Sequence, residues 1–380
     1  MGQEADSRQT WIKLIESQPD INGRYRHQTR LDGNAGGGSF SLVFKADSVE
    51  DGQRVCLKFY DPQMQNDQYR VACFERESQI MVMLRDQADI LRLVEPAMGF
   101  PCAVDTKSGE QLTFPLRYIA TELASSDARH YIYWPKKRSV ADDLECFRAM
   151  CRGVQRIHSK GICHRDIKPE NFFLTTGGQV RLGDFGTARL VEVGVPPLSE
   201  EYRMMWRGDL RYTAPELFCG LDADAAHFFR GDFFGLGATL FELLTQSLLT
   251  QHIYDPGFVT DLRGMFGLMP SGERPAVFAG LIPSIAASRP LPSIAEFTDR
   301  VPGCVLSRLD DLYRSLAALD FAQRLVDWDH VFGRIRICET ILRNEQKYKA
   351  FWLQQQQWRQ KAQEKQSRCG AQEPGAGNGH

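Results

Sequence analysis

Polar side chains suited to handling phosphate gather in two nearby stretches of the sequence. The stretch HRDIKPENFFL at 164–174 carries Asp166, Lys168 and Asn171, and DFG at 184–186 supplies Asp184. Phosphoryl transfer requires positioning and charge neutralisation more than covalent chemistry from the protein. In this interpretation Asp166 accepts the proton of an attacking hydroxyl, and Lys168 steadies the moving phosphate. Asn171 and Asp184 offer the hard oxygen ligands that Mg²⁺ prefers.

A second set of candidates lies earlier in the chain. The stretch DGNAGGGSFSLVFKA at 32–46 is rich in glycine, which lets backbone N–H groups approach phosphates closely, although a flexible turn explains such a stretch equally well. The stretch VCLK places Lys58 on a strand among apolar residues. Because an unpaired buried ammonium is costly, Lys58 needs an acidic partner, and Glu77 on the helix that follows can supply one.

The elements that must position these residues fall into two parts. Strand-like runs dominate first, interrupted by one helical pattern; the runs are SFSLVFKA, RVCLKFY and PLRYIATEL, and the helix is YRVACFERESQIMVMLRDQ. From about residue 128 helical patterns take over. In the first of them Leu144, Phe147, Cys151, Val154 and Ile157 recur every three to four residues. We therefore expect an α+β protein.

The chain divides into four segments in this interpretation. They are an N-terminal arm at 1–25, a small β-rich part at 26–122, a larger helical part at 123–343, and a tail at 344–380. Within the third segment, 250–303 is rich in proline and glycine and predicts a loop-rich insertion.

The tail should begin as a helix and end in a disordered stretch, GAQEPGAGNGH. Its helix, at about 344–366, either packs on the large helical part or binds a partner. Tyr348, Phe351, Trp352 and Trp358 could share a rough stripe, which favours packing.

Composition excludes several classes of function. The formal net charge of -2 offers no global footprint for nucleic acid. No apolar run reaches membrane length, so we expect no insertion into a membrane. The ten cysteines include no C-x-x-C pair, which favours a reducing, cytoplasmic location.

The motifs taken together, in their order along the chain, resemble the eukaryotic-type protein kinase family. The positions that carry this resemblance are Gly36, Gly38, Ser41 and Val43 in the glycine-rich loop, Lys58, Glu77, Asp166 to Asn171, Asp184-Phe185-Gly186, Ala214-Pro215-Glu216, Asp232 and Arg324. The resemblance implies a two-lobed fold, with a small β-rich N-lobe that has one main helix and a larger helical C-lobe. It also implies ATP and Mg²⁺ as cofactors and proteins as substrates.

The resemblance further assigns roles around the nucleotide. Thr121 falls at the gatekeeper position beside the adenine pocket. The backbones of Glu122 and Ala124 are then expected to hydrogen-bond the adenine, and Asp127 to approach the ribose. Asp232 is expected to hold the backbone of the catalytic loop, Asp166 to Asn171. Arg324 is expected to form an ion pair with Glu216.

The stretch DIKPEN at 166–171 is typical of serine/threonine kinases rather than tyrosine kinases. In the mechanism that the family implies, Lys58, oriented by Glu77, holds the α and β phosphates. Asp166 and Lys168 then serve the acceptor hydroxyl and the γ-phosphate.

The sequence departs from the family pattern at two positions. Ser41 replaces the third loop glycine, which predicts altered nucleotide affinity. Asp209 stands where most serine/threonine kinases have threonine. Its carboxylate could pair with Lys168, but it would also repel Asp166 and raise the pKa of one of the two carboxyl groups.

The usual phosphate acceptor before Gly208 is also missing, since MMWR holds neither serine nor threonine. Ser199 and Tyr202 are the remaining candidate phosphosites, and Glu200 or Glu201 could take their place without modification.

Two alternatives to a protein kinase remain. A pseudokinase would use the same fold as a scaffold; the intact Lys58, Asp166, Asn171 and Asp184 argue against it, whereas Asp209 and Ser41 weakly favour it. A small-molecule kinase of the aminoglycoside type ranks last, because those enzymes lack the Ala214-Pro215-Glu216 segment.

Overall fold

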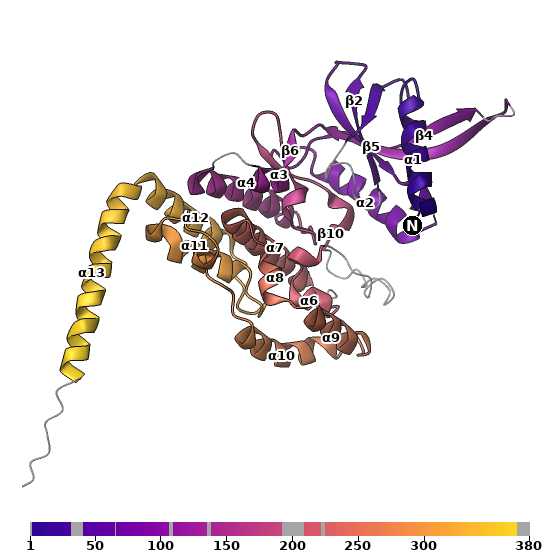
Figure 1. The fold of residues 1–380 in the computed structure, drawn as a ribbon. Coiled ribbons are helices and arrows are strands. Elements are labelled where there is room, and N and C mark those ends of the chain that lie inside the picture. Colours follow the sequence, from indigo (N-terminus) through magenta and orange to yellow (C-terminus); the bar gives the residue numbers. More distant parts are fainter. Residues whose placement is uncertain are drawn as a thin grey trace, which may run out of the picture.

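The computed structural model describes residues 2–31, 41–64, 66–105, 109–134, 138–191, 209–221 and 225–370. They form a smaller lobe built on a β-sheet and a larger helical lobe, with one long helix extending away from the larger lobe (Figure 1). The expected two-lobed α+β fold is confirmed.

The smaller lobe is built on a five-stranded antiparallel sheet with the order β1-β2-β3-β5-β4. Its elements are α1 (Gly2–Ser17), β1 (Tyr25–Arg30), β2 (Ser41–Ser48), β3 (Arg54–Tyr60), η2 (Pro62–Met64), α2 (Gln68–Met83), β4 (Leu93–Asp105) and β5 (Gln111–Glu122). Phe44, Leu57 and Phe59 are fully buried in the core between this sheet and α1.

The larger lobe begins directly after β5. Its elements are β6 (Ser126–Asp127), α3 (Ala128–Tyr133), α4 (Val140–His158), β7 (Ile162–Cys163), η3 (Pro169–Asn171), β8 (Phe172–Leu174), β9 (Val180–Leu182), η4 (Phe185–Thr187), β10 (Arg189–Leu190), η5 (Leu210–Tyr212), α6 (Pro215–Phe218), α7 (Ala225–Thr245), α8 (Leu249–Ile253), α9 (Pro256–Gly267), α10 (Arg274–Ser288), η6 (Ile294–Glu296), α11 (Gly303–Leu316), α12 (Trp328–Arg343) and α13 (Glu345–Gly370).

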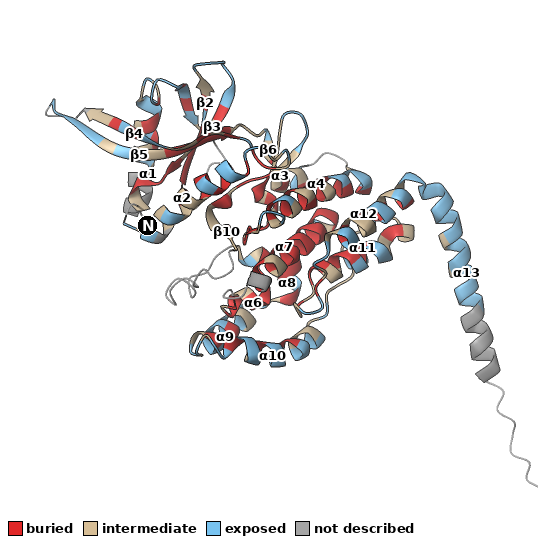
Figure 2. Cartoon of the chain, turned by 180° about the vertical axis from the view of Figure 1, so that it is seen from behind, coloured by how far each residue is buried: buried red, intermediate tan, exposed pale blue. Residues whose placement is uncertain are grey.

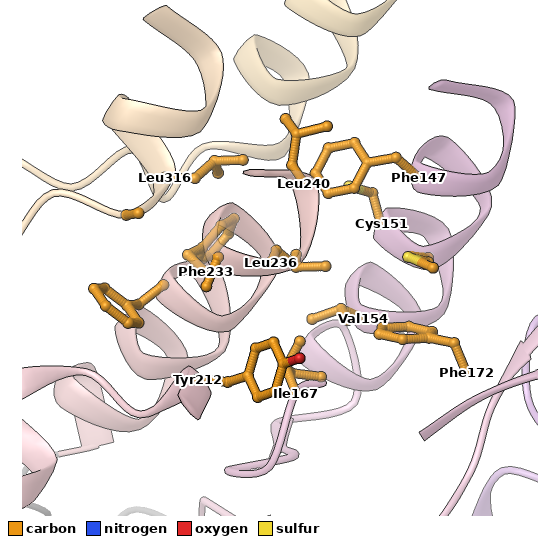
Figure 3. Packing of buried hydrophobic residues seen from close by; sticks show 14 of the residues in the cluster. Phe147, Cys151, Val154, Ile167, Phe172, Tyr212, Phe233, Leu236, Leu240 and Leu316 are labelled. Atoms are coloured by element: carbon orange, nitrogen blue, oxygen red, sulfur yellow. The ribbon is translucent and has the colours of Figure 1, made fainter. Parts of the chain in front are cut away.

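Helices α4 and α7 form the centre of the larger lobe. Helix α4 starts at a capping box in which Ser139 and Asp142 bond to each other's backbone N–H groups. The five apolar positions that predict this helix are all fully buried. Figure 3 shows Phe147, Cys151 and Val154 of α4 facing residues of α7 and the chain that carries the predicted catalytic residues.

Two glycines let α7 approach its neighbours closely. A Cβ at Gly235 would lie 2.7 Å from the carbonyl oxygen of Ile167, and one at Gly237 would lie 2.7 Å from the backbone nitrogen of Ala317. Because the atoms in the way belong to backbone, a side chain at either position would push the elements apart. The first contact sets the distance between α7 and the loop that holds Asp166.

The expected N-terminal arm is wrong. Residues 2–17 form α1, whose Ile12 and Ile15 are buried in the core of the smaller lobe. The Trp11 ring also meets that of Phe114 edge-on, with 5.2 Å between centroids. Three apolar residues in five positions are enough to anchor a short helix on a sheet, so this segment is part of the lobe.

The expected loop-rich insertion at 250–303 is also wrong, since α8, α9, α10 and η6 occupy most of it. Pro256 and Pro275 lie in the first turns of α9 and α10, where no intrahelical N–H bond is lost. Pro283 lies inside α10, and the helix continues past it despite the lost hydrogen bond. Phe266 and Phe278 then bury these helices against the lobe.

The tail helix does not pack on the larger lobe along most of its length, so that expectation is wrong. Phe351 is 56% exposed and Trp358 is 63% exposed, and only Trp352 of the stripe lies against Gly303 of α11. The direction set at Asn344, between α12 and α13, carries α13 away from the larger lobe, and Figure 2 shows its residues up to 361 mostly exposed. Residues 371–380, expected to be disordered, lie outside the described part.

Among the described helices, none combines the length and apolar character that crossing a membrane requires.

Candidate active site

Lys58 lies at the meeting point of three elements. On β3 it is paired with Val43 of the neighbouring strand β2. Its Nζ lies 2.8 Å from both carboxylate oxygens of Glu77 on α2. The same Nζ lies 2.8 Å from Oδ1 of Asp184, 126 residues further along the chain. The structure therefore brings together three of the residues that the sequence singles out.

The charges in this cluster stabilise one another. Burial by itself lowers the pKa of Lys58, but the two carboxylates outweigh it and hold that pKa above its ordinary value. Burial by itself raises the pKa of Asp184, and Lys58 more than offsets this, which leaves it at about 2. Burial also raises the pKa of Glu77, which Lys58 only partly counteracts. Lys58 is therefore a charged ammonium poised for an anion.

The backbone of Asp184 is held in a strained conformation. Its φ of 58° and ψ of 68° lie in the left-handed region, which non-glycine residues rarely adopt. The following residue, Phe185, is fully buried and packs against the His164 ring, with 5.3 Å between centroids. This packing fixes the turn that presents the Asp184 carboxylate.

Three donors hold the carboxylate of Asp166. Lys168 Nζ lies 2.7 Å and Asn171 Nδ2 lies 3.2 Å from Oδ2, and the backbone nitrogen of Asp209 lies 2.9 Å from Oδ1. Asn171 Nδ2 also donates to the backbone carbonyl of Asp166 at 2.7 Å. The carboxylate is thereby oriented without being sealed off, since its side chain stays about one tenth exposed.

Asp232 of α7 organises the loop before Asp166. Its buried carboxylate accepts from the backbone N–H groups of His164 and Arg165, each at 2.8 Å. The His158 ring nitrogen lies 2.9 Å from the same carboxylate. Arg165 has a φ of 69°, so these bonds hold the loop in a conformation that it would otherwise avoid.

Glu216 and Arg324 form an ion pair with both side chains fully buried. Arg324 Nη2 donates to Oε2 of Glu216 at 3.1 Å, and its other donors reach the backbone carbonyls of Ala318 and Arg230. The pair ties α6, which contains Pro215 and Glu216 of the Ala214-Pro215-Glu216 motif, to the helical core.

The oxygens of Asn171 and Asp184 suit a divalent cation. The Nδ2 bonds to Asp166 fix the amide of Asn171, and its Oδ1 accepts no hydrogen bond from the described residues. Lys58 donates to Oδ1 of Asp184, and Oδ2 accepts no hydrogen bond from the part of the chain that the structure describes. One amide oxygen and one carboxylate oxygen are therefore available, and such hard donors fit Mg²⁺.

Asp209 does not interact as expected. Its carboxylate accepts from the backbone N–H of Arg211 at 3.0 Å and from Nε of the same residue at 2.9 Å, and it has no ion pair with Lys168. Burial by itself raises the pKa of Asp209, but the hydrogen bonds from Arg211 hold it below its ordinary value. The prediction of a raised pKa is therefore wrong for Asp209, because a cation two residues away neutralises its charge.

The residues expected around adenine lie at the end of β5. Thr121 is nearly buried and donates its hydroxyl proton to the carbonyl of Glu122 at 3.2 Å. Neither the amide nor the carbonyl of Ala124 is hydrogen-bonded to another described residue. Asp127 uses Oδ1 to cap α3 through the N–H of His130, at 2.8 Å. Ala124 therefore offers unpaired backbone groups to a ligand, whereas the N–H of Glu122 is bonded to the Arg92 carbonyl.

The predicted glycine-rich loop is described only at its end. Ser41 is buried at the start of β2, followed by Val43 opposite Lys58, whereas Gly36 and Gly38 lie outside the described residues. The candidate phosphosites Ser199 and Tyr202 also lie outside them.

Sequence reasoning missed a buried polar network beside Asp166. Arg129 of α3 donates to Glu170 at 3.0 Å and to Glu242 of α7 at 2.6 Å, and Tyr133 also donates to Glu242 at 2.7 Å. The hydroxyl of Tyr212 in η5 accepts a hydrogen bond from Arg129 and donates one to Glu242. The available signal was Glu242 itself, a charge within an apolar helix that required a partner.

Comparison with known proteins adds a family match over most of the chain. Residues 30–328 match the family model described as protein kinase domain. The serine/threonine-protein kinase NLK2 of Xenopus tropicalis is 29% identical over 262 residues, which cover 65% of this chain and 51% of that protein. The Wee1-like protein kinase of Oryza sativa is 26% identical over 277 residues, which cover 72% of this chain and 47% of that protein.

A probable cell division protein kinase of Encephalitozoon cuniculi is 26% identical over 211 residues, which cover 55% of this chain and 69% of that protein. The chain thus spans about half the length of NLK2, the first of these relatives.

Proposed function

The chain belongs to the protein kinase family, and on that premise we propose that it is an active serine/threonine kinase that phosphorylates proteins with ATP. The arrangement around Asp166 carries this proposal. Three donors orient its carboxylate while leaving it accessible, as a residue that meets an acceptor hydroxyl requires. The stretch DIKPEN and the name of the NLK2 relative favour serine or threonine as the acceptor.

In the proposed reaction the acceptor hydroxyl attacks the γ-phosphorus of ATP. A bond forms between the hydroxyl oxygen and phosphorus, and the bond from phosphorus to the β,γ-bridging oxygen breaks, which releases ADP. Asp166 orients the hydroxyl and takes its proton. Lys168, whose ammonium lies 2.7 Å from that carboxylate, stabilises negative charge on the transferred group.

The remaining site residues are assigned to nucleotide and metal. We assign Lys58, oriented by Glu77, to the α and β phosphates, and the backbone of Gly36, Gly38 and Ser41 to the same phosphates. Asn171 and Asp184 would hold Mg²⁺, which when bound supplies positive charge that offsets the phosphates.

The adenine and ribose contacts are proposed for the end of β5 and the chain that follows. Thr121 would lie beside the adenine, and Glu122 and Ala124 would bond to it through their backbones. Asp127, with one carboxylate oxygen not used in capping α3, would meet the ribose.

A pseudokinase is the second candidate, and its support has weakened. It rests on Ser41 and Asp209, yet the charge of Asp209 is paired with Arg211 and its backbone N–H supports Asp166. The small-molecule kinase stays last, because the anchored Glu216 segment suits the docking of a peptide.

Incubation of the purified protein with labelled ATP, Mg²⁺ and a library of serine, threonine and tyrosine peptides tests the proposal. The wild type should label serine or threonine peptides, and the Lys58→Met, Asp184→Asn double variant should not. Circular dichroism of both proteins shows whether the variant is folded. Equal labelling by the wild type and the double variant would refute the catalytic proposal and favour a pseudokinase. Labelling confined to tyrosine peptides would refute serine or threonine as the acceptor.

A further inference from the structure

Helix α1 precedes the family match, which begins at residue 30, and yet it packs on the sheet that carries Ser41, Val43 and Lys58. It contacts β1, β4 and the η2 turn that follows β3, and Figure 1 shows it beside β4. Ile12 and Ile15 fix its position on the sheet. A helix that precedes the matched domain is therefore an integral part of the sheet-based lobe.

One side chain of α1 reaches these strands. Arg8 lies three and four positions before Trp11 and Ile12, hence on the same side of the helix. Its Nη2 donates to the backbone carbonyl of Ser41 at 2.9 Å, and its Nε lies 3.5 Å from Oδ2 of Asp61. Arg8 thus contacts the first residue of β2 and the residue directly after β3.

The Asp61 contact gives Arg8 a fixed place. Asp61 is 1% exposed, and a carboxylate buried to this degree needs a cation. Within the described part of the chain, Arg8 is the basic residue in ion-pair contact with it. Oδ1 of Asp61 is itself held by the N–H of Gln63, at 3.1 Å, so the carboxylate is a rigid anchor for the guanidinium.

The Ser41 contact acts next to the phosphate-binding residues. Ser41 pairs with Tyr60 at the ends of β2 and β3, and two residues along the register Val43 faces Lys58. The Ser41 carbonyl belongs to the peptide unit that joins Ser41 to Leu42, so this bond holds the first peptide unit of β2, directly after the glycine-rich stretch. Ser41, whose backbone is among the groups assigned to the phosphates, is thereby held in place before the nucleotide arrives.

We propose that Arg8 is a positioning residue for nucleotide binding, through which α1 holds the end of the glycine-rich loop against β3 and Lys58. The substrate class, Mg·ATP, rests on the proposed function. Preorganisation improves binding because less motion is lost when the ligand enters, so Arg8 acts on affinity rather than on the chemical step.

Calorimetric titration of the full chain with Mg²⁺ and a non-hydrolysable ATP analogue tests this. Arg8→Ala should weaken binding about tenfold, as expected when a charged hydrogen bond is lost. Arg8→Lys should recover part of the affinity, because one ammonium can meet Asp61 or Ser41 but cannot span both as the guanidinium does. Lys13→Gln is the matched control, since it removes one positive charge from an exposed position of the same helix and should bind like the wild type.

Two further measurements separate positioning from general damage. In the kinase assay Arg8→Ala should raise the KM for ATP and leave kcat within about twofold. Hydrogen exchange without nucleotide should rise at 41–48 in Arg8→Ala and stay unchanged at 111–122. Unchanged affinity and unchanged exchange in Arg8→Ala would overturn the proposal, as would an equal loss in Lys13→Gln.

A wild type that binds no ATP analogue would refute the proposed function instead. The exchange comparison would in that case still decide whether Arg8 orders the start of β2.

Discussion

Replacement of Asp209 by threonine tests whether the unusual carboxylate beside Asp166 takes part in the reaction. The backbone N–H of Asp209 donates to Asp166, and this bond survives any change of side chain. The carboxylate itself binds Arg211, which also donates to Glu170 at 2.9 Å. Asp209→Thr therefore removes one of two anions on Arg211 and leaves the other in place.

The expected magnitudes are small for both stability and rate. The side chains of Asp209 and Arg211 are 19% and 42% exposed, and a pair open to water to this extent contributes about 1 kcal/mol. Threonine can replace the carboxylate as the cap of η5, which offsets part of this loss. Because Asp166 keeps its three donors, we expect kcat to stay within about tenfold of the wild type or to rise.

Steady-state phosphorylation of a serine or threonine peptide and urea unfolding measure the two quantities. Asp209→Asn is the matched control, because it keeps the size and the cap but removes the charge. A thousandfold loss of kcat in both variants, with stability unchanged, would refute this reasoning. It would mean that the carboxylate acts on the acceptor or the phosphate directly.

Three other predictions concern the scaffold. Arg324→Met should lower the free energy of unfolding in urea by about 3–5 kcal/mol, because it leaves the buried carboxylate of Glu216 without a partner. The Arg324→Met, Glu216→Leu double variant should recover most of that loss. A double variant less stable than the single variant would contradict this. Gly237→Ala should destabilise by about 1–3 kcal/mol through the clash with backbone, whereas Gly333→Ala in α12, where a Cβ meets nothing within 4 Å, should be neutral or stabilising. The pKa of Asp184 is 3.8 in the unfolded chain and about 2 in the folded protein. Its carboxylate therefore stabilises the fold above pH 3.8, and this contribution is lost as the pH falls through about 2. The stability difference between wild type and Asp184→Asn should therefore narrow between pH 3.8 and about 2 in urea unfolding at a series of pH values; a difference that stays constant would rule out this linkage.

The sequence predicted the parts of the fold whose signals are local. Helix α4 follows from apolar residues at a spacing of three to four, and β3 carries Lys58 in an apolar run. The pairing of Glu77 with Lys58 was expected because a buried ammonium needs an acidic partner, whereas the contact of Asp184 with Lys58 was not predicted. For the features that were predicted, residue type and spacing are sufficient.

The features that were missed depend on distant or directional contacts. Arg129 and Glu242 are 113 residues apart, and no spacing rule joins them. Asp209 turns toward Arg211 rather than Lys168 because the η5 turn brings the guanidinium to it, which composition alone does not reveal. Arg8 reaches Ser41 only because α1 folds onto the sheet, and its anchoring residues are too few to stand out in the sequence.

The long helix at the end of the described chain also has a mechanical consequence. With 26 residues and a rise of about 1.5 Å per residue, α13 is about 39 Å long. It is joined to the protein at Asn344, and Trp352 near that end lies against Gly303 of α11, whereas its residues from 353 to 361 are mostly exposed. A rotation of about 10° at Asn344 would move the far end by about 7 Å, given that length. Small rearrangements of α11 and α12 would therefore be amplified along α13, well away from the site where phosphate is transferred.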